Sequence, residues 1–247
     1  MIINELDMRQ YLIDNYPNEG CGLVYDGLFH ACENLSEQKT DCFKIDKYEF
    51  MKAIKSSTGL QAVVHSHPLP SAQDPYIHVC TPSAGDMNGQ ADTQVPWMIY
   101  ATDGINISEP LTFPQPQTIP LLGREFIHGV HDCYSIVRDY YFQVRGIKLM
   151  NWARDYQWWE QDGISMYTHH LPEMGFKEIY EHQIKEGDIV LMCILGKDRV
   201  ANHAAIYLGD DVIVHHLAGR LSCEDSLYKW RKQITNYYTY EGVTNAA

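Results

Sequence analysis

Long apolar runs are missing from this chain of 247 residues. Its longest apolar stretch lies between Ile189 and Leu195, whereas a transmembrane helix needs about 20 predominantly apolar residues. The N-terminus also lacks a basic segment followed by an apolar one, which is the pattern of a secretion signal. The sequence therefore predicts a protein that folds in a cytoplasm and does not insert into a membrane.

Positive charge is scarce. Only 19 Lys and Arg residues stand against 32 Asp and Glu residues, which gives a net charge of −13 at pH 7. Proteins that bind nucleic acid neutralise its phosphates with Lys and Arg, and anionic membrane surfaces attract the same residues. No basic cluster occurs, so neither nucleic acid nor an anionic membrane is an expected partner.

Closely spaced cysteine pairs are also missing. The chain has 7 cysteines, and no two of them are spaced as Cys-x-x-Cys. An odd number of cysteines without a secretion signal predicts reduced thiols, most of them acting as small buried apolar side chains. Cys133 differs, because it stands at the start of a predicted helix.

Prolines concentrate in residues 109–120, where four of them occur without helical periodicity. Such a segment predicts a stiff, extended linker. We therefore expect one domain over residues 1–108, a linker over 109–120 and a second domain over 121–247.

The predicted fold class is α+β, with a different arrangement in each half. In the first half, alternating patterns indicate an α/β sandwich: helices over 6–15, 46–56 and 83–91, and strands over 21–25, 60–64 and 96–101. In the second half, Asp132 is a plausible N-cap for a helix that Gly146 ends. This helix would bury the face that carries Ile136, Val137, Tyr140, Tyr141 and Val144. An antiparallel meander is predicted to follow, with strands over 188–195, 201–208 and 212–216.

Two histidines end the apolar strand of the first half. His65 and His67 are two residues apart, so they point to the same face of the strand. With Asp86 they make a set of two imidazoles and one carboxylate, which is typical of a catalytic zinc with an open position. Glu19 is the candidate base and Ser83 the candidate oxyanion donor. The alternative is that these histidines are ordinary polar residues, since the chain has 12 of them.

These five residues resemble the JAMM (Mov34/MPN-like) metallopeptidase motif, in which a distant Glu precedes His-x-His-Pro and then Ser-x-x-Asp. The resemblance covers residues 1–108 and implies a cytidine-deaminase-like sandwich, a bound zinc, and Glu19 acting on the bound water. Residues 71–74 repeat the Ser-x-x-Asp spacing and remain an alternative. Ser83 and Asp86 are preferred because a helix-compatible stretch follows them. The longer gap after His67 implies an inserted loop, which would oppose peptidase activity if it covered the metal.

Cys133 is the candidate nucleophile of the second half. A helix N-terminus favours the thiolate, and His203, on a predicted strand, is the candidate base. The following strand carries His215 and His216, one of which would orient His203. A three-residue turn places His215 opposite His203, and a two-residue turn at 209–210 places His216 there. The alternative is a buried cysteine with scattered imidazoles.

Three strings of the second half resemble the NlpC/P60 cysteine peptidases: residues 128–135 around Asp132-Cys133, residues 187–190, and residues 203–209. The resemblance implies a papain-like domain over about 120–240, with Cys133, His203 and His215 as the catalytic residues. It also implies hydrolysis of amide bonds in peptidoglycan peptides. The chain departs from the pattern at Tyr134, where small residues are common. It also has a Trp-rich insert around 152–159, which would either shape a substrate groove or belong to the core.

The order of the two domains and the stretch 121–134 resemble the tail-tip assembly proteins of lambda-like phages. This resemblance implies other phage tail-tip proteins as partners, a place in the host cytoplasm during assembly, and a place at the tail tip of the virion. We expect a peptidase that aids tail assembly and cell-wall penetration. The alternative is a structural assembly factor with little catalytic activity. The first half alone would also suit a deubiquitinase-like or sulfur-cofactor enzyme, which the attached wall-peptidase half argues against.

Overall fold

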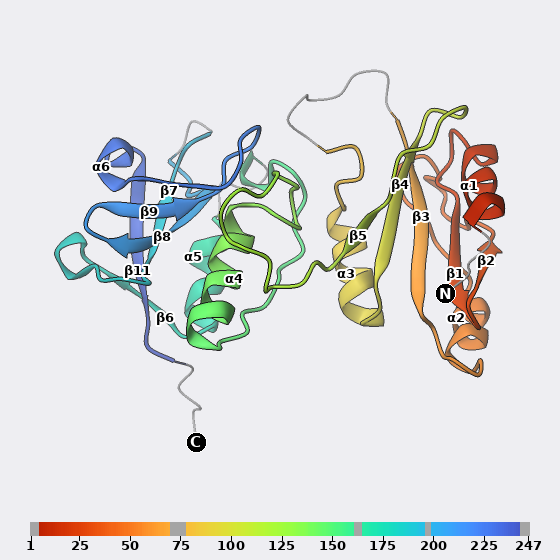
Figure 1. Cartoon of the computed structure of the whole chain (residues 1–247), viewed down its shortest axis with the longest axis horizontal. Helices are drawn as coiled ribbons and strands as arrows, with labels where there is room; N and C mark the ends of the chain where they lie inside the picture. The colour runs from red at the N-terminus through yellow and green to blue at the C-terminus, as the bar shows by residue number, and fades with distance from the viewer. Residues whose placement is uncertain (1–4, 70–77, 161–164, 196–198, 243–247) are drawn as a thin grey trace. The chain divides into compact units, whose positions relative to one another are not determined.

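The computed structural model describes residues 5–69, 78–160, 165–195 and 199–242 (Figure 1). The chain divides into two compact units, Met1–Gln115 and Pro116–Ala247, and the division falls within the Pro-rich segment 109–120. Both units mix helices with a β-sheet. None of the described helices combines the length and the apolar character needed to cross a bilayer.

Unit 1 is built on a five-stranded sheet of order β2-β1-β3-β4-β5, in which only β3 and β4 are parallel neighbours. Helix α3 lies between β3 and β4 in sequence, as the crossover between parallel strands requires. The elements are α1 (Glu5–Asp14), β1 (Cys21–Tyr25), β2 (Leu28–Cys32), α2 (Lys47–Ile54), β3 (Ala62–Pro68), α3 (Ala84–Thr93), β4 (Trp97–Thr102) and β5 (Leu111–Phe113).

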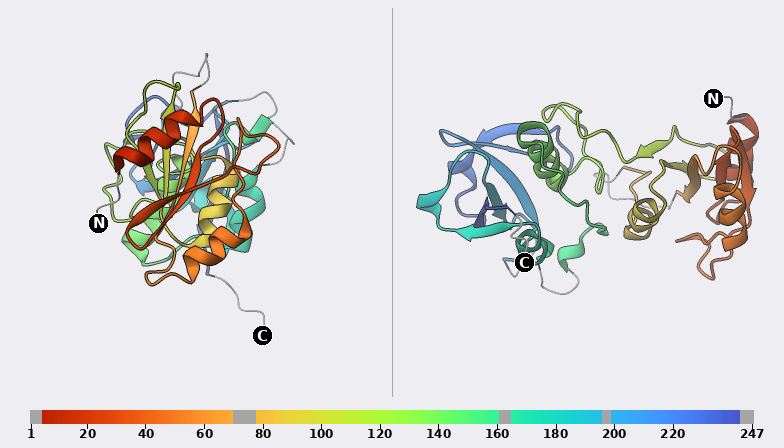
Figure 2. Two further views of the ribbon diagram at one scale, coloured as in Figure 1. Left: turned by 90° about the vertical axis from the view of Figure 1, so that its right-hand side faces the viewer. Right: turned by 90° about the horizontal axis from the view of Figure 1, so that it is seen from below.

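The two faces of this sheet have different cover. Helix α1 crosses one face (Figure 2), where Met8 and Leu12 pack against a cluster that includes Val64 and Tyr100. Because side chains alternate along a strand, His65 points to the opposite face. Strand β3 continues past the predicted end at residue 64 to Pro68, so both His65 and His67 lie on regular strand.

The Pro-rich segment is divided between the two units. Residues 111–113 form strand β5, which pairs with β4. The carbonyl oxygens of Ile119 and Pro120 accept hydrogen bonds from Arg124 in unit 2. The sequence contains no strand signal at β5, because its three residues are flanked by prolines.

Unit 2 has a six-stranded sheet of order β10-β9-β8-β7-β11-β6, in which every pair of neighbours is antiparallel. Helix α4 packs against β8 and β9 (Figure 1). The elements are α4 (Cys133–Arg145), a 3-10 turn (Trp158–Glu160), α5 (Met166–Glu173), β6 (Phe176–Ile179), a second 3-10 turn (Glu181–Gln183), β7 (Ile189–Met192), β8 (His203–Gly209), β9 (Val212–His215), β10 (Cys223–Ser226), α6 (Leu227–Trp230) and β11 (Ile234–Tyr240).

Local chemistry explains where α4 begins and ends. The Asp132 side chain accepts a hydrogen bond from the Ser135 amide in a capping box, and Gly146 ends the helix in the left-handed conformation with φ of 66°. Four of the five predicted core residues of this helix are buried. The prediction was wrong for Val144, which lies in the last turn and is 59% exposed.

Candidate active sites

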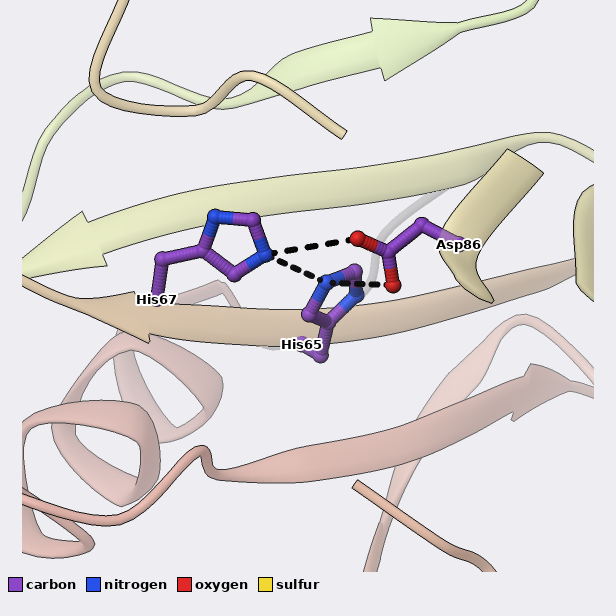
Figure 3. Close-up of side chains that lie close together, drawn as sticks. All are labelled: His65, His67 and Asp86. Carbon is purple, nitrogen blue, oxygen red and sulfur yellow. Dashed lines mark hydrogen bonds and ion pairs between the residues drawn. The ribbon is translucent and has the colours of Figure 1, made fainter. Parts of the chain in front are cut away.

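The candidate metal ligands of unit 1 converge on one point. The Nε2 atoms of His65 and His67 lie 3.0 Å apart. Asp86, in the first turn of α3, places Oδ1 3.2 Å from Nε2 of His65 and Oδ2 3.5 Å from Nε2 of His67 (Figure 3). Each of the three residues therefore offers a ligand atom within 4.8 Å of the others.

The chemistry of these donors fits zinc, which accepts imidazole nitrogen and carboxylate oxygen with one position left open for water or substrate. Two imidazole nitrogens that face each other at this distance need a proton or a cation between them. Although burial opposes it, the neighbouring His65 and His67 hold the pKa of Asp86 well below its usual range. Asp86 is therefore a carboxylate, which is the form that binds a metal.

Glu19 stands beside this cluster, just before β1. Its Oε1 lies 4.0 Å from Nε2 of His67, and the carboxyl group is buried. Burial raises the pKa of Glu19 to about 7, against the lowering effect of His67. A carboxyl group that titrates near neutral pH can both accept and donate a proton, which suits the predicted role as a base.

Ser83 has a different surrounding from the one expected of an oxyanion donor. Its side chain caps α3, and Oγ donates a hydrogen bond to Oδ2 of Asp86 at 2.8 Å. The hydroxyl proton of Ser83 is thereby used to orient a candidate ligand. The alternative string at residues 71–74 lies outside the described residues, as does most of the inserted loop.

Cys133 lies at a cavity in unit 2. It is the first residue of α4, and it lines this cavity together with Asp132, His203, Tyr167, Trp158 and Trp159. The helix position alone favours the thiolate, but burial raises the pKa of the Cys133 thiol to about 11, and the charge of Asp132 adds to this effect. The free cysteine is therefore a neutral thiol that needs a base.

His203 and His215 meet inside unit 2. Nε2 of His203 lies 3.0 Å from Nδ1 of His215, whereas His216 forms its hydrogen bond with the carbonyl oxygen of Arg220 at 3.2 Å. Burial and the two neighbouring imidazoles hold the pKa of His203 well below its usual range. His203 is therefore a neutral imidazole that can accept a proton.

The hairpin that joins these residues differs from both predicted registers. The pairs are Ala205 with His215 and Gly209 with Val212, and the register shifts between Tyr207 and Gly209. His203 thus contacts His215 diagonally, two residues away along its own strand. The error has two parts. The two-residue turn lies at Asp210 and Asp211 instead of at 209–210, and a bulge between Tyr207 and Gly209 then shifts the register by one residue.

A buried ion pair supports the start of α4, and the sequence analysis missed it. Both Nε and Nη2 of Arg154 donate to Oδ2 of Asp132, at 3.0 and 2.6 Å. Oδ2 also accepts from the amide of Gly129 at 2.8 Å. Arg154 lies in the Trp-rich insert and Asp132 at the helix N-cap, and no spacing rule connects them.

The Trp-rich insert contributes to both the core and the cavity. Trp152 is buried and stacks on Tyr134 with ring centroids 4.1 Å apart, while Trp158 and Trp159 line the cavity. The stack explains why a large residue is accommodated at position 134. Tyr167, on the helix α5 that the sequence did not predict, is a further residue of the cavity that sequence reasoning missed.

The chain is similar in sequence to a known domain family and to phage proteins. Residues 123–239 match the NlpC/P60 family. The chain is 34% identical over 228 residues to the tail tip assembly protein K of Escherichia phage N15, covering 87% of this chain and 88% of that protein. The chain belongs to the tail tip assembly protein K family. The protein of the same name from Escherichia phage lambda is 33% identical over 181 residues, covering 72% of this chain and 81% of that protein.

Solved structures that are similar to this chain include two NlpC/P60 proteins. The NlpC/p60 domain of the peptidoglycan hydrolase SagA is 21% identical, with a TM-score of 0.32, and the match covers 48% of this chain and 89% of that one. An NlpC/P60 family protein of Bacillus cereus is 12% identical, with a TM-score of 0.30, over 94% of this chain and 66% of that one.

Proposed function

We propose that this chain hydrolyses amide bonds of peptidoglycan stem peptides with Cys133, His203 and His215, and that this activity helps a phage tail cross the cell wall. The observation that supports it best is the convergence of a thiol and a neutral imidazole on one cavity, with a second imidazole bonded to the first. The NlpC/P60 match over residues 123–239 favours the same reaction, and membership of the protein K family favours a place in the phage tail.

The residues suggest a definite order of proton movements. His203 accepts the proton of the Cys133 thiol as the sulfur attacks the substrate carbonyl. His215, whose Nδ1 lies 3.0 Å from Nε2 of His203, orients this imidazole during the transfer, as the third member of a catalytic triad orients the base. His203 then delivers the proton to the leaving amine, and water releases the acyl group from sulfur by the reverse sequence.

The experiment is digestion of purified peptidoglycan by the full chain, with the released fragments identified by mass spectrometry. We expect new amine and carboxyl ends within the stem peptides, and loss of this activity after treatment with iodoacetamide but not with a metal chelator. Fragments cut in the glycan, or cleavage that the chelator alone abolishes, would contradict the proposal.

For unit 1 we propose a zinc site with His65, His67 and Asp86 as ligands. A bound zinc would polarise a peptide carbonyl and lower the pKa of water. Around it, Ser83 orients the Asp86 carboxylate, and Glu19 holds or moves a proton at its own carboxyl oxygen. The substrate proposed for a peptidase of this kind is another tail-tip protein, encountered in the host cytoplasm during assembly or at the tail tip of the virion.

Elemental analysis tests this site. We expect about one zinc per chain, lost in the double variant His65→Ala/His67→Ala. A second group, His169, His170 and Glu173, also has ligand atoms within 4.8 Å but is largely exposed. His169→Ala/His170→Ala is therefore the matched control and should retain the zinc. A folded wild-type chain without metal, or zinc that follows the control pair, would exclude the site.

A structural assembly factor is the second candidate function. It is favoured by the relatives, which are named for tail tip assembly. In that case the other tail-tip proteins are binding partners and not substrates, and neither site needs to catalyse a reaction.

A further inference from the structure

The sulfur of Cys133 has an unexpected neighbour on helix α5. Its Sγ lies 3.1 Å from the hydroxyl oxygen of Tyr167, which is within hydrogen-bond distance. A hydroxyl group from α5 therefore lies at the atom that would carry the negative charge.

The Tyr167 ring has little freedom to turn away. Its centroid lies 5.7 Å from that of Trp158, 6.1 Å from that of Tyr134 and 6.4 Å from that of Trp152, and only 4% of the residue is exposed. A hydroxyl that is held in place before the reaction stabilises a developing charge without the cost of reorganisation. The aromatic cage around Tyr167 thus fixes its hydroxyl at the sulfur.

We infer that Tyr167 is a catalytic residue, whose hydroxyl donates a hydrogen bond to the ionised sulfur of Cys133 once His203 has taken the thiol proton. This inference rests on the proposed function for the pairing of Cys133 with His203. One proton moves, from sulfur to the imidazole, and Tyr167 keeps its own. Burial holds the pKa of Tyr167 well above its usual range, so the hydroxyl stays protonated as a donor.

The need for this donor follows from the surroundings of the thiol. Burial and the adjacent Asp132 both oppose a negative sulfur. Arg154, the nearby cation, is engaged with that same Asp132. A neutral donor at the sulfur stabilises the thiolate without bringing a further charge into the cavity.

The rate of alkylation of Cys133 by iodoacetamide at pH 8 tests the inference without a substrate. Peptide mapping by mass spectrometry separates Cys133 from the other cysteines. Loss of a hydrogen bond to an ionised group lowers the thiolate population about tenfold or more. Because a less stabilised thiolate is also more nucleophilic, we expect Tyr167→Phe to react about three- to tenfold more slowly.

Tyr134→Phe is the matched control. Tyr134 belongs to the same aromatic cluster, and its hydroxyl donates to the carbonyl oxygen of Met150 at 2.6 Å rather than to the sulfur. We expect this variant to alkylate like the wild type, with circular dichroism and melting temperature measured for both. Equal or faster alkylation in folded Tyr167→Phe, or the same slowing in both variants, would overturn the role of Tyr167. A wild type that digests no peptidoglycan, but whose Cys133 still depends on Tyr167, would overturn only the proposed hydrolase.

Discussion

Replacing Cys133 with Ala, or His203 with Ala, is expected to lower peptidoglycan-peptide hydrolysis by a factor of at least about 10³. The first variant removes the nucleophile. The second leaves a buried thiol, with a pKa of about 11, without the base that would take its proton. Because the two residues act as one unit, the double variant should be no slower than either single variant. Initial rates of muropeptide cleavage measure all three.

A control variant and a pH profile test whether His203 is the base. His216→Ala is the matched control, since His216 is bonded to a backbone carbonyl instead of to His203, and it should retain most of the activity. The pKa of His203 is depressed and that of the thiol is raised, so the neutral pair persists from mildly acidic to alkaline pH. The rate should therefore change little between about pH 6 and pH 9. A steep rise with pH through this range, or an active His203→Ala variant, would contradict the assignment of His203.

The same variants separate the lytic from the structural function. If the thiol serves only hydrolysis, phage that carry Cys133→Ala should assemble tails of normal number and appearance. Loss of tails with a folded Cys133→Ala protein would show that the site is needed for assembly itself.

The elements that the sequence predicted are those whose signals are local. Helix α4 is specified by Asp132 at its start, Gly146 at its end and apolar residues at helical spacing between them. Strand β3 is specified by the apolar run before His65. Helix α5 escaped prediction because Pro172 stands inside it and two histidines interrupt its apolar pattern. Strand β11, with Ile234 at its start, alternates weakly and is stabilised by pairing with β6 and β7.

The difference between local signals and packing-dependent contacts also holds for the candidate sites. Neighbours on one strand, such as His65 and His67, are predictable because a strand fixes their common face. Contacts between distant elements are not, because they depend on how the elements pack. Tyr167 reaches Cys133 through α5, and the diagonal contact of His203 with His215 depends on a register shift that no turn residue indicates.

Removing Arg154 is expected to have the largest effect on stability. Arg154 and Asp132 are both buried, at 4% and 2% exposure, so Arg154→Ala leaves a carboxylate uncompensated inside unit 2. Breaking a buried pair in this way costs about 3–5 kcal/mol, measurable as a lower free energy of unfolding in urea. Arg145→Ala is the control. Arg145 is exposed at the end of α4, and its loss should cost about 1 kcal/mol or less.

A double-mutant cycle distinguishes this ion pair from simple loss of packing. The cycle compares Asp132→Asn and Arg154→Met, each alone, with the double variant. The double variant removes both charges, so its destabilisation should be smaller than the sum of the two single-variant destabilisations. Burial opposes the ionised form of Asp132, but Arg154 and His128 hold its pKa below the usual range. The pair therefore stabilises the wild type above the pKa of an unfolded aspartate, about 3.9, and this contribution is lost as the pH falls further. Additive single effects, or an Arg154→Ala variant as stable as the control, would show that the charge of Asp132 is not what Arg154 compensates.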